Sequence, residues 1–438
     1  MPALRGTPRR GLLGATLGFF VGFAAVALFG PMAHQLQSGM HLSPVTLGFV
    51  VAAPLLSGSL LRIPFSAWVD TTGGRKPFLI LLGLSILGMA GLLAVFKSAN
   101  AGNLTARYFS VLFALGILCG CGIATFSVGI GQVSYWFPQS EQGWALGTYA
   151  GVGNMAPGLF SLLLPLALVE WGLSGAYCAW LIFLAVGTLA YASIGCNAWY
   201  FQLRQRELQR SEAWRLAREH GQELFPRGNV LDGLILSAKQ WQTWALVALY
   251  LATFGGFLAL TAWLPTFWAS YYRVSVPVAG ALTALFSLWA SVIRIAGGSW
   301  SDRFGGEKTA IFALSSLLVG SLLMSFSAHF VLSILAELLI ALGMGVNNAA
   351  VFKMVPGYAP DAVGGASGWV GGLGALGGFV VPPIMGFFVQ LLGRNGYARG
   401  FLVFTALAAI CLTLAITLNA SALRSLEEPL EGGKAKVA

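Results

Sequence analysis

Two stretches of the sequence decide the fold: RIPFSAWVDTTGGRK, from Arg62 to Lys76, and RIAGGSWSDRFGGEK, from Arg294 to Lys308. At a register of 232 residues, seven of the fifteen aligned positions are identical: the arginine, the isoleucine, the tryptophan, the aspartate, both glycines and the final lysine. This density of identities indicates that the second half of the chain repeats the first. The glycines permit a tight turn, and the aspartate can cap a helix end or pair with a cation.

A glycine pattern indicates the same duplication. At a register of 221 residues, five small residues of the first half align with five of the second: Gly143, Ala145, Gly147, Gly151 and Gly153 with Gly364, Ala366, Gly368, Gly372 and Gly374. Glycine at every fourth helical position leaves one face almost without side chains, so another helix can approach it closely. We therefore expect two equivalent helices, one in each half, with smooth packing faces.

The composition excludes a soluble protein. Only 9% of the residues are charged and 57% are hydrophobic, and the mean hydropathy is +0.77, whereas soluble domains carry about 25% charged residues. The net charge of +10 does not indicate nucleic-acid binding, because the basic residues are scattered over short segments between apolar runs. The five cysteines lie inside apolar runs without the spacing of a metal site. The chain is predicted to cross a membrane many times.

Twelve apolar runs are long enough to span a hydrocarbon core of about 30 Å. They cover residues 11–36, 45–69, 78–97, 107–136, 143–169, 175–200, 241–270, 278–301, 308–327, 330–356, 363–392 and 399–420. The sequence thus predicts an all-α membrane protein with twelve transmembrane helices in two pseudo-symmetric six-helix bundles, residues 1–200 and 240–438. A connector, residues 201–239, contains a helix-forming stretch of mixed charge from Arg204 to His220. Parallel six-helix repeats are typical of transporters whose halves rock around a site near mid-membrane.

The distribution of basic residues predicts the orientation. Eighteen Lys and Arg residues fall on the side of both termini and the connector, against five on the opposite side. Because cytoplasmic loops carry the excess of positive charge, both termini are expected in the cytoplasm. We expect a multi-pass protein of the inner (plasma) membrane.

Two arginines stand where charges are costly. Arg62 lies eight residues before Asp70, and Arg294 lies eight before Asp302, which places each about 12 Å inside a helix end, near the bilayer midplane. An arginine there costs about 3 kcal/mol, so it needs a wet cavity or a partner. Glu337 is the only carboxylate well inside an apolar run, and it does not neutralise two arginines. The flat guanidinium fork suits a small anion with coplanar oxygens.

Other interpretations of these charges stay open. Arg62 and Arg294 can be structural, bonded to backbone carbonyls or extended toward the membrane surface. Glu337 can be a protonated structural residue bonded to a neighbouring helix, or it can carry a proton.

The motif Asp-x-x-Gly-Gly-Arg-Lys at Asp70–Lys76 resembles the loop that major facilitator transporters carry between their second and third helices, and Asp302–Lys308 stands where the second half repeats it. The resemblance implies the major facilitator fold. It does not indicate a substrate.

Longer stretches resemble the nitrate/nitrite porter family. GIATFSVGIGQVSYWFP (Gly122–Pro138) with QGWALGTYAGVGN (Gln142–Asn154) is similar to the first signature of that family, and GWVGGLGALGGFVVP (Gly368–Pro382) is similar to the second. GMGVNNAAVFKMVP (Gly343–Pro356) and YLATFGGF (Tyr250–Phe257) are similar to segments of its tenth and seventh helices. Together with the arginine segments, these matches cover about a third of the chain.

The resemblance implies a set of site residues. Arg62 and Arg294 match the two substrate arginines of the family. Phe126 and Phe254 match aromatic residues that sandwich the flat anion, and Tyr250 matches a hydroxyl donor to it. Aromatic faces exclude water and accept a planar, delocalised ion, and a phenol supplies a directed hydrogen bond. Accessory candidates are Tyr149, Asn154, Asn347, Gly151 and Gly372.

The chain also departs from the family. Thr125, Gln132 and Tyr149 stand where the first signature usually carries asparagines. Because these side chains differ in reach and in their number of donors, the resemblance supports the anion class rather than one ion.

The sequence therefore predicts a carrier of nitrate, nitrite or both that works by alternating access and exchanges one ion for the other. An empty site leaves two like charges facing each other, which opposes closure until an anion binds. The alternatives are proton-coupled nitrate symport, with Glu337 or His34 as proton carrier, and transport of a small organic anion. A sensor or an enzyme is not expected, because the sequence has no long soluble domain and no nucleophile–base pair. We expect a monomer in the lipid bilayer, with nitrate and nitrite as partners and no cofactor, metal or nucleic acid.

Overall fold

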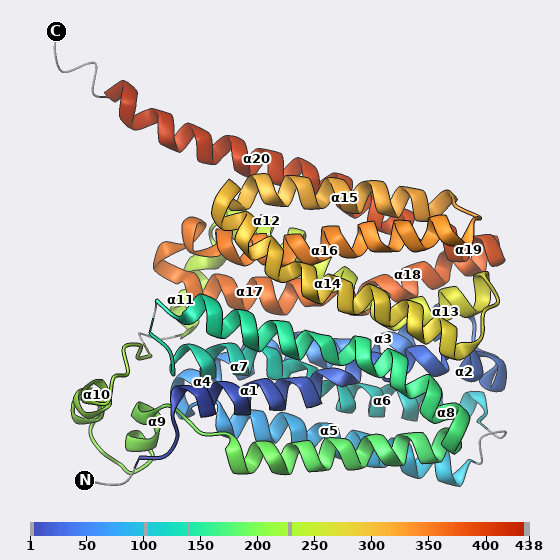
Figure 1. Ribbon diagram of the computed structural model, residues 1–438, viewed down its shortest axis with the longest axis horizontal. Helices are drawn as coiled ribbons and strands as arrows, with labels where there is room; N and C mark the ends of the chain where they lie inside the picture. Colours follow the sequence, from blue (N-terminus) through green and yellow to red (C-terminus); the bar gives the residue numbers. More distant parts are fainter. Residues whose placement is uncertain (1–3, 100–103, 139, 227–229, 433–438) are drawn as a thin grey trace.

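The computed structural model of the protein is a bundle of long helices that run side by side (Figure 1). It describes residues 4–99, 104–138, 140–226 and 230–432. All regular secondary structure within these ranges is helical.

Each half consists of long helices with short irregular turns inside them. The first half contains α1 (Pro8–Phe23), α2 (Ala33–Met40), α3 (Pro44–Leu60), α4 (Arg62–Thr72), α5 (Arg75–Ser98), α6 (Phe109–Gly120), α7 (Thr125–Ser134) and α8 (Gln142–Ile194), with 3₁₀ turns η1 (Ala24–Ala27), η2 (Gly30–Met32), η3 (Ala106–Tyr108) and η4 (Cys121–Ala124). The second half contains α12 (Trp241–Tyr250), the π-helical segment η5 (Leu251–Gly255), α13 (Gly256–Tyr271), α14 (Val276–Phe304), α15 (Gly306–Phe326), α16 (Phe330–Tyr358), η6 (Pro360–Ala362), α17 (Val363–Ala375), α18 (Gly377–Leu392), α19 (Arg394–Arg399) and α20 (Leu402–Gly432).

The predicted twelve crossings are confirmed, with one difference in the fifth and sixth. Within the residues that the structure describes, eleven helical segments are long and apolar enough to cross a membrane. One of them, α8, has 53 residues, or about 80 Å of helix, far more than a bilayer core requires. At Gly172 its backbone has φ 66° and ψ −179°, and the two arms run back along each other (Figure 1). The fifth and sixth crossings are thus joined by a kink rather than by a loop.

The glycine pairs of the two repeated stretches end helices, as the sequence predicts. α4 ends directly before Gly73, which has φ 77°, and α14 ends directly before Gly305, which has φ 90°. Residues with a Cβ rarely adopt these positive φ values. The aspartate before each turn has a different partner: Asp70 Oδ1 accepts a hydrogen bond from the Tyr135 hydroxyl at 2.7 Å, whereas Asp302 Oδ1 pairs with Lys353 Nζ at 2.5 Å.

Two seams join the halves. α3 packs against α18, and the first arm of α8 packs against α14. The contact is close: a Cβ added to Gly48 of α3 would lie 2.6 Å from the Cα of Pro383, and one added to Gly158 of α8 would lie 3.0 Å from Cγ of Leu288. Glycine permits these backbone approaches.

The seams are less closely packed toward the end of the bundle where α1 begins. A Cβ on Gly151 would meet nothing closer than Ile295, at 3.8 Å, and nothing described lies within 4 Å of such a position on Gly147 or on Gly364. Gly372 of α17 still meets Ile63 at 2.6 Å. The seams are therefore closely packed around Gly48, Gly158 and Gly372, whereas the exposed glycines Gly147 and Gly364, nearer the connector, have no described neighbour on their Cβ side.

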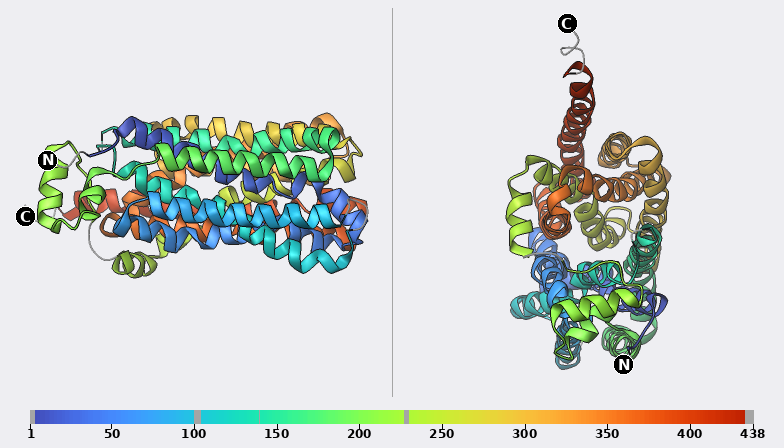
Figure 2. Two further views of the ribbon diagram at one scale, coloured as in Figure 1. Left: turned by 90° about the horizontal axis from the view of Figure 1, so that it is seen from below. Right: turned by 90° about the vertical axis from the view of Figure 1, so that its left-hand side faces the viewer.

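The connector lies at one end of the bundle. It contains α9 (Trp199–Arg204), α10 (Arg210–Glu219) and α11 (Val230–Ala238). α9 and α10 lie beyond the membrane-spanning helices, at the end where α1 begins and toward which α20 runs (Figures 1 and 2). The predicted helix within residues 204–220 is confirmed as α10, and α11 packs against α17 of the second half.

Candidate anion-binding site

Arg62 is held at the centre of the bundle. It begins α4, directly after the interruption at Leu61 that separates α3 from α4, and it is 1% exposed. Its Nε donates to the carbonyl of Gly58 at 2.9 Å, and its Nη1 donates to the carbonyl of Gly371, in the other half, at 3.2 Å. Its Nη2 is buried and has no hydrogen-bond partner among the described residues. Backbone bonding thus accounts for two of the three guanidinium nitrogens and leaves the third for a ligand.

Arg294 has fewer fixed contacts. It lies within the unbroken helix α14 and is half-buried. Its Nη1 is buried without a hydrogen-bond partner in the described part of the chain. Among the described residues, neither arginine forms an ion pair with a carboxylate, and the two arginines interact electrostatically with each other. The predicted surplus of positive charge is therefore present at this place.

Phe254 lies beside both arginines. The Cζ atoms of Arg62 and Arg294 lie 5.0 Å and 5.8 Å from the centroid of its ring. The Cζ atom of Arg62 also lies 4.9 Å from the centroid of Phe126. A guanidinium on an aromatic face gains a cation–π contact of about 0.5–2 kcal/mol, the upper end when water is excluded. The arginines and both predicted phenylalanines are thus gathered in one cluster.

The two phenylalanine rings are close to each other. Their centroids are 5.8 Å apart, with 27° between the ring planes. A flat ion between two rings needs about 3.5 Å of contact distance on each side. An anion held between Phe126 and Phe254 therefore requires the rings to move apart from this arrangement.

Tyr250 adds an unpaired hydroxyl to the cluster. Its ring stacks on Phe254 at 4.8 Å with 10° between the planes, and its side chain is fully buried. Its hydroxyl lies within reach of the Arg294 guanidinium and interacts electrostatically with both arginines, but it forms no hydrogen bond of normal geometry among the residues that the structure describes. Tyr250 and Phe254 are four residues apart, so they lie on the same face at the junction of α12 and η5.

Three buried donors in this cluster thus lack a hydrogen bond of normal geometry within the described part of the chain: Nη2 of Arg62, Nη1 of Arg294 and the hydroxyl of Tyr250. Buried polar groups are normally satisfied, and each that is not costs about 1–3 kcal/mol. A ligand that only accepts hydrogen bonds and carries negative charge satisfies all three. The surrounding aromatic rings exclude water, which strengthens the attraction between charges.

Two accessory candidates bond to the backbone. The Tyr149 hydroxyl donates to the carbonyls of Thr125 and Phe126 at 3.1 Å and 2.9 Å. The Nδ2 of Asn347 donates to Thr253 Oγ1 at 2.9 Å. Both side chains therefore contact segments that carry site residues.

The other accessory candidates lie at the seams. Asn154 offers its backbone carbonyl to Ser291 Oγ of the other half at 3.1 Å, and its Oδ1 is buried without a described partner. Gly151 faces Ile295, and Gly372 faces Ile63, so each glycine contacts the isoleucine next to a site arginine.

Glu337 and His34 lie apart from the cluster. Glu337 is 1% exposed, and its Oε1 accepts a hydrogen bond from Trp268 Nε1 at 3.4 Å. Trp268 lies near the end of α13 that is remote from Tyr250 and Phe254. His34 is exposed on α2.

Sequence reasoning missed several contacts of the cluster. The ring centroids of Phe19 and Phe126 lie 5.2 Å apart, and those of Phe23 and Phe254 lie 6.5 Å apart. Their spacing of four residues places them on one face of the first helix, but nothing in the sequence distinguishes them among the 30 phenylalanines of the chain. The carbonyl of Gly371 was missed because a backbone acceptor leaves no signal in residue identity.

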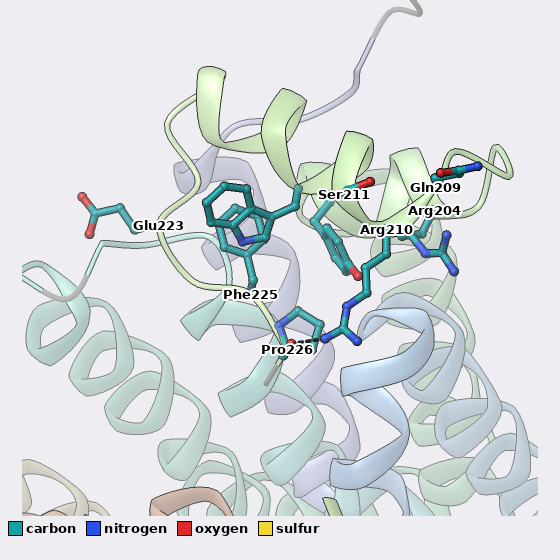
Figure 3. Close-up of a pocket in the computed structure, with 9 residues that line it drawn as sticks. Arg204, Gln209, Arg210, Ser211, Glu223, Phe225 and Pro226 are labelled. Carbon is teal, nitrogen blue, oxygen red and sulfur yellow. Dashed lines mark hydrogen bonds between the residues drawn. The ribbon is translucent and has the colours of Figure 1, made fainter. Parts of the chain in front are cut away.

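A separate surface pocket lies in the connector (Figure 3). Its volume is about 1070 Å³, and its lining includes Tyr200, Arg204, Arg210 and Trp214. Arg210 is turned toward Pro226, whose carbonyl accepts a hydrogen bond from Nη2 at 3.2 Å. None of the candidate site residues lines this pocket.

Relatives of known name match most of the chain. The probable nitrate/nitrite antiporter NarK1 of Thermus thermophilus is 29% identical over 90% of this chain and 88% of its own length. The probable nitrate transporter NarT of Staphylococcus epidermidis is 26% identical over 93% of this chain and 96% of its own. The nitrite extrusion protein of Bacillus subtilis is 28% identical over 92% of each chain.

Solved structures share the fold at lower identity. The xylose transporter XylE of E. coli, in a partially occluded inward-open conformation, matches with a TM-score of 0.73 and 14% identity, covering 94% of this chain and 97% of that one. The human organic anion transporter MFSD10 matches with a TM-score of 0.64 and 19% identity, covering 94% of this chain and 100% of that one. The sequence profile of the Major Facilitator Superfamily matches residues 15–276 and 267–437. The chain therefore belongs to the major facilitator superfamily.

Proposed function

We propose that the protein carries nitrate and nitrite across the membrane by alternating access and exchanges one ion for the other. The observation that carries this proposal is the group of three buried, unpartnered donors, on Arg62, Arg294 and Tyr250. Nitrate and nitrite are flat, carry one negative charge and only accept hydrogen bonds. Their oxygens suit a guanidinium fork, and their faces suit an aromatic wall.

The relatives support the choice of ion. Three of them, from different organisms, carry names that refer to nitrate or nitrite, and they match this chain along nearly its whole length. The size of the cluster favours a small ion as well, because Phe126 and Phe254 are only 5.8 Å apart. A bulky organic anion would require a larger rearrangement of these rings.

The two like charges support exchange. Without an anion, Arg62 and Arg294 repel each other, so closure of the halves over an empty site is opposed. A bound anion offsets that repulsion and allows the site to reorient. One-for-one exchange also avoids the cost of moving net negative charge inward, about 2.3 kcal/mol per 100 mV. Glu337 bonds to Trp268 rather than to the cluster, which disfavours it as the proton carrier of a symport.

The seams support an arrangement in which the site opens toward the connector. Gly48 at the far end and Gly158 in the middle of the first arm of α8 are closely packed, whereas nothing described lies within 4 Å of a Cβ position on Gly147. We place the termini and the connector in the cytoplasm of a cell with this protein in its inner membrane, so this arrangement faces inward. The rocking units are residues 1–200 and 240–438, joined by residues 201–239, and one chain forms a complete carrier.

Counterflow in vesicles tests this function. Purified protein is reconstituted into liposomes that are loaded with nitrite, nitrate is added outside, and the pH gradient is varied. Exchange predicts nitrate uptake that needs internal nitrite and ignores the pH gradient. Uptake that depends on the proton gradient without internal anion would identify a symport instead. Failure of nitrate to compete with a transported organic acid would reject nitrate as the substrate.

A further inference from the structure

We infer that Asn347 and Tyr149 are positioning residues: Asn347 holds the π segment that contains Phe254, and Tyr149 holds the first residues of α7, where Phe126 follows an irregular turn, so that each presents one phenylalanine to the anion. This inference rests on the proposed function and assigns to these side chains a role other than direct contact with the ion. Its basis is where their hydrogen bonds go and which backbone segments they contact.

The Phe254 side of the site depends on the π segment η5. Here Gly256 N–H bonds to the carbonyl of Leu251, five residues earlier, so the chain contains one residue more per turn than an α-helix. One added residue rotates α13 by about 100° relative to α12. The segment therefore fixes the direction in which Phe254 points relative to the rest of α13.

Asn347 of α16 ties this segment to the helix before it. Its Nδ2 donates to Thr253 Oγ1, inside the π segment, at 2.9 Å and to the carbonyl of Leu249, in the preceding turn, at 3.4 Å. Thr253 Oγ1 in turn donates to the carbonyl of Leu249 at 2.9 Å. The amide is fully buried, so these bonds form without competition from water.

The π segment is also confined by the break between α17 and α18. A Cβ on Gly255 would lie 2.6 Å from the carbonyl oxygen of Gly374, and one on Gly377 would lie 2.6 Å from the carbonyl oxygen of Leu251. The backbone therefore has no room to move toward α17. Asn347 restrains it from another side, which leaves Phe254 one direction over the two arginines.

The Phe126 side is built in the same way with a different irregular turn. The 3₁₀ turn η4, Cys121–Ala124, leads directly into α7, and Phe126 is the second residue of that helix. Tyr149 of α8 donates its hydroxyl to the carbonyls of Thr125 and Phe126. Its phenol comes closer to the position of a Cβ on Gly129 than any side chain there would allow. Glycine at 129 is thus required for the phenol to reach these carbonyls.

The two halves therefore orient their phenylalanines in a similar way. A buried donor from a neighbouring helix, Asn347 on α16 or Tyr149 on α8, bonds to an irregular turn or to the residues next to it. The site phenylalanine lies in or beside that turn, and its ring lies against Arg62. Loss of the donor leaves the ring in place as a hydrophobic group but removes the bond that sets its direction.

A double-mutant cycle distinguishes positioning from general support of the fold. The measurements are nitrate affinity by titration and the melting temperature, on purified full-length protein. Asn347→Leu preserves the size of the side chain and removes the donor. We expect a roughly tenfold loss of nitrate affinity, because one hydrogen bond contributes about 1 kcal/mol or somewhat more. In a Phe254→Leu background the same change should have no further effect on affinity, because the ring through which it acts is gone.

Tyr149→Phe and Phe126→Leu form the second cycle, with the same expectation. Thr253→Val provides a milder change at the π segment, in case Asn347→Leu does not fold. Thr261→Val is the matched control: Thr261 Oγ1 makes the same kind of buried bond, to the carbonyl of Phe257 at 2.8 Å, one turn beyond the π segment. It should lower the melting temperature without changing nitrate affinity.

Two results would overturn the inference. Asn347→Leu and Tyr149→Phe could leave affinity at the wild-type value, or they could lower it equally with and without the phenylalanine that each is paired with. Wild-type protein that does not bind nitrate at all would instead reject the proposed function, so the two failures are distinguishable.

Discussion

The two arginines come from copies of one ancestral stretch, but their surroundings differ. Arg62 comes directly after an interruption in its helix and donates to two carbonyls, one of them across the halves. Arg294 lies in an unbroken helix, is only half-buried, and its Nη1 has no partner among the described residues. Both copies thus retain the arginine, but the helix geometry and the hydrogen-bond partners around it differ.

This difference suggests different roles in one cycle. Arg62 is held in place by its bonds to two backbone carbonyls, and its bond to the carbonyl of Gly371 joins the halves. Arg294 carries no such bond across the halves in the described part of the chain, so it can move with the anion when the halves rock. In the proposed cycle one anion contacts both arginines. Separation of the halves must then break the bond from Arg62 to the Gly371 carbonyl as well as the bond from Ser291 Oγ to the Asn154 carbonyl, and only the first of these involves a site arginine.

The largest effect is expected from arginine-to-lysine changes, which keep the charge and lose the fork. Arg62→Lys and Arg294→Lys should each lower nitrate affinity about 10- to 150-fold, since hydrogen bonds to charged groups contribute about 1.5–3 kcal/mol. Only Arg62→Lys should also lower the melting temperature, because the carbonyls of Gly58 and Gly371 lose their donors. Titration and thermal unfolding of both variants check this. Equal melting temperatures for the two variants would remove the distinction between the fixed and the mobile arginine.

The next largest effect is expected from a change in the seams between the halves. Gly48 lies in a closely packed part of a seam, whereas Gly147 has no described neighbour on its Cβ side. Gly48→Ala places a methyl group against the backbone of Pro383, and overpacking of this kind costs about 1–3 kcal/mol. We expect the population to shift away from the arrangement that is open toward the connector. Labelling of single cysteines at the far end should accelerate severalfold. Gly147→Ala, where a Cβ meets nothing described within 4 Å, serves as the control and should label at the wild-type rate.

A smaller effect is expected from Tyr250→Phe. The hydroxyl of Tyr250 is buried and forms no hydrogen bond of normal geometry among the described residues, so its removal should cost little stability and should lower nitrate affinity about tenfold. Tyr177→Phe is the matched case, because the hydroxyl of Tyr177 donates to the carbonyl of Leu28. It should lower the melting temperature and leave affinity unchanged. A Tyr250→Phe variant that binds nitrate as the wild type does would exclude the phenol from the site.

The smallest effect is expected at the repeated aspartates. Asp302 and Lys353 form an exposed pair, and such pairs contribute about 0–1 kcal/mol. Asp302→Asn should therefore change the melting temperature little. Asp70→Ala removes the part-buried bond from Tyr135 and should lower it more, by the equivalent of about 1 kcal/mol. If Asp302→Asn lowered the melting temperature more than Asp70→Ala, the Asp302 turn would contribute more to stability than the Asp70 turn, contrary to this prediction.

The fold was predictable because its signals are spread over the whole chain. Long apolar runs mark each crossing, the glycines at 73 and 305 mark where helices end, and the repeated stretches relate the halves. The kink at Gly172 was not predictable, because a short break and a short loop have similar composition. The sequence predicts a loop of a few residues between the fifth and sixth crossings, whereas the structure has a single non-helical residue there, Gly172.

The site was predictable in its charges and less so in its geometry. Arg62 and Arg294 stand out because charge at mid-membrane is costly, and Phe126, Phe254 and Tyr250 were inferred from resemblance. The bond of Arg62 to Gly371 and the π segment that contains Phe254 were not accessible, since both depend on backbone geometry. Asn347 and Tyr149 were expected near the ion, and their hydrogen bonds instead go to the chain.

A structure of the protein with nitrate bound tests the central claim most directly. We predict one flat anion within about 3 Å of Arg62 Nη2, Arg294 Nη1 and the Tyr250 hydroxyl, with Phe126 and Phe254 moved apart to admit it. An anion bound elsewhere in the bundle, with these three donors still unpartnered, would contradict the claim.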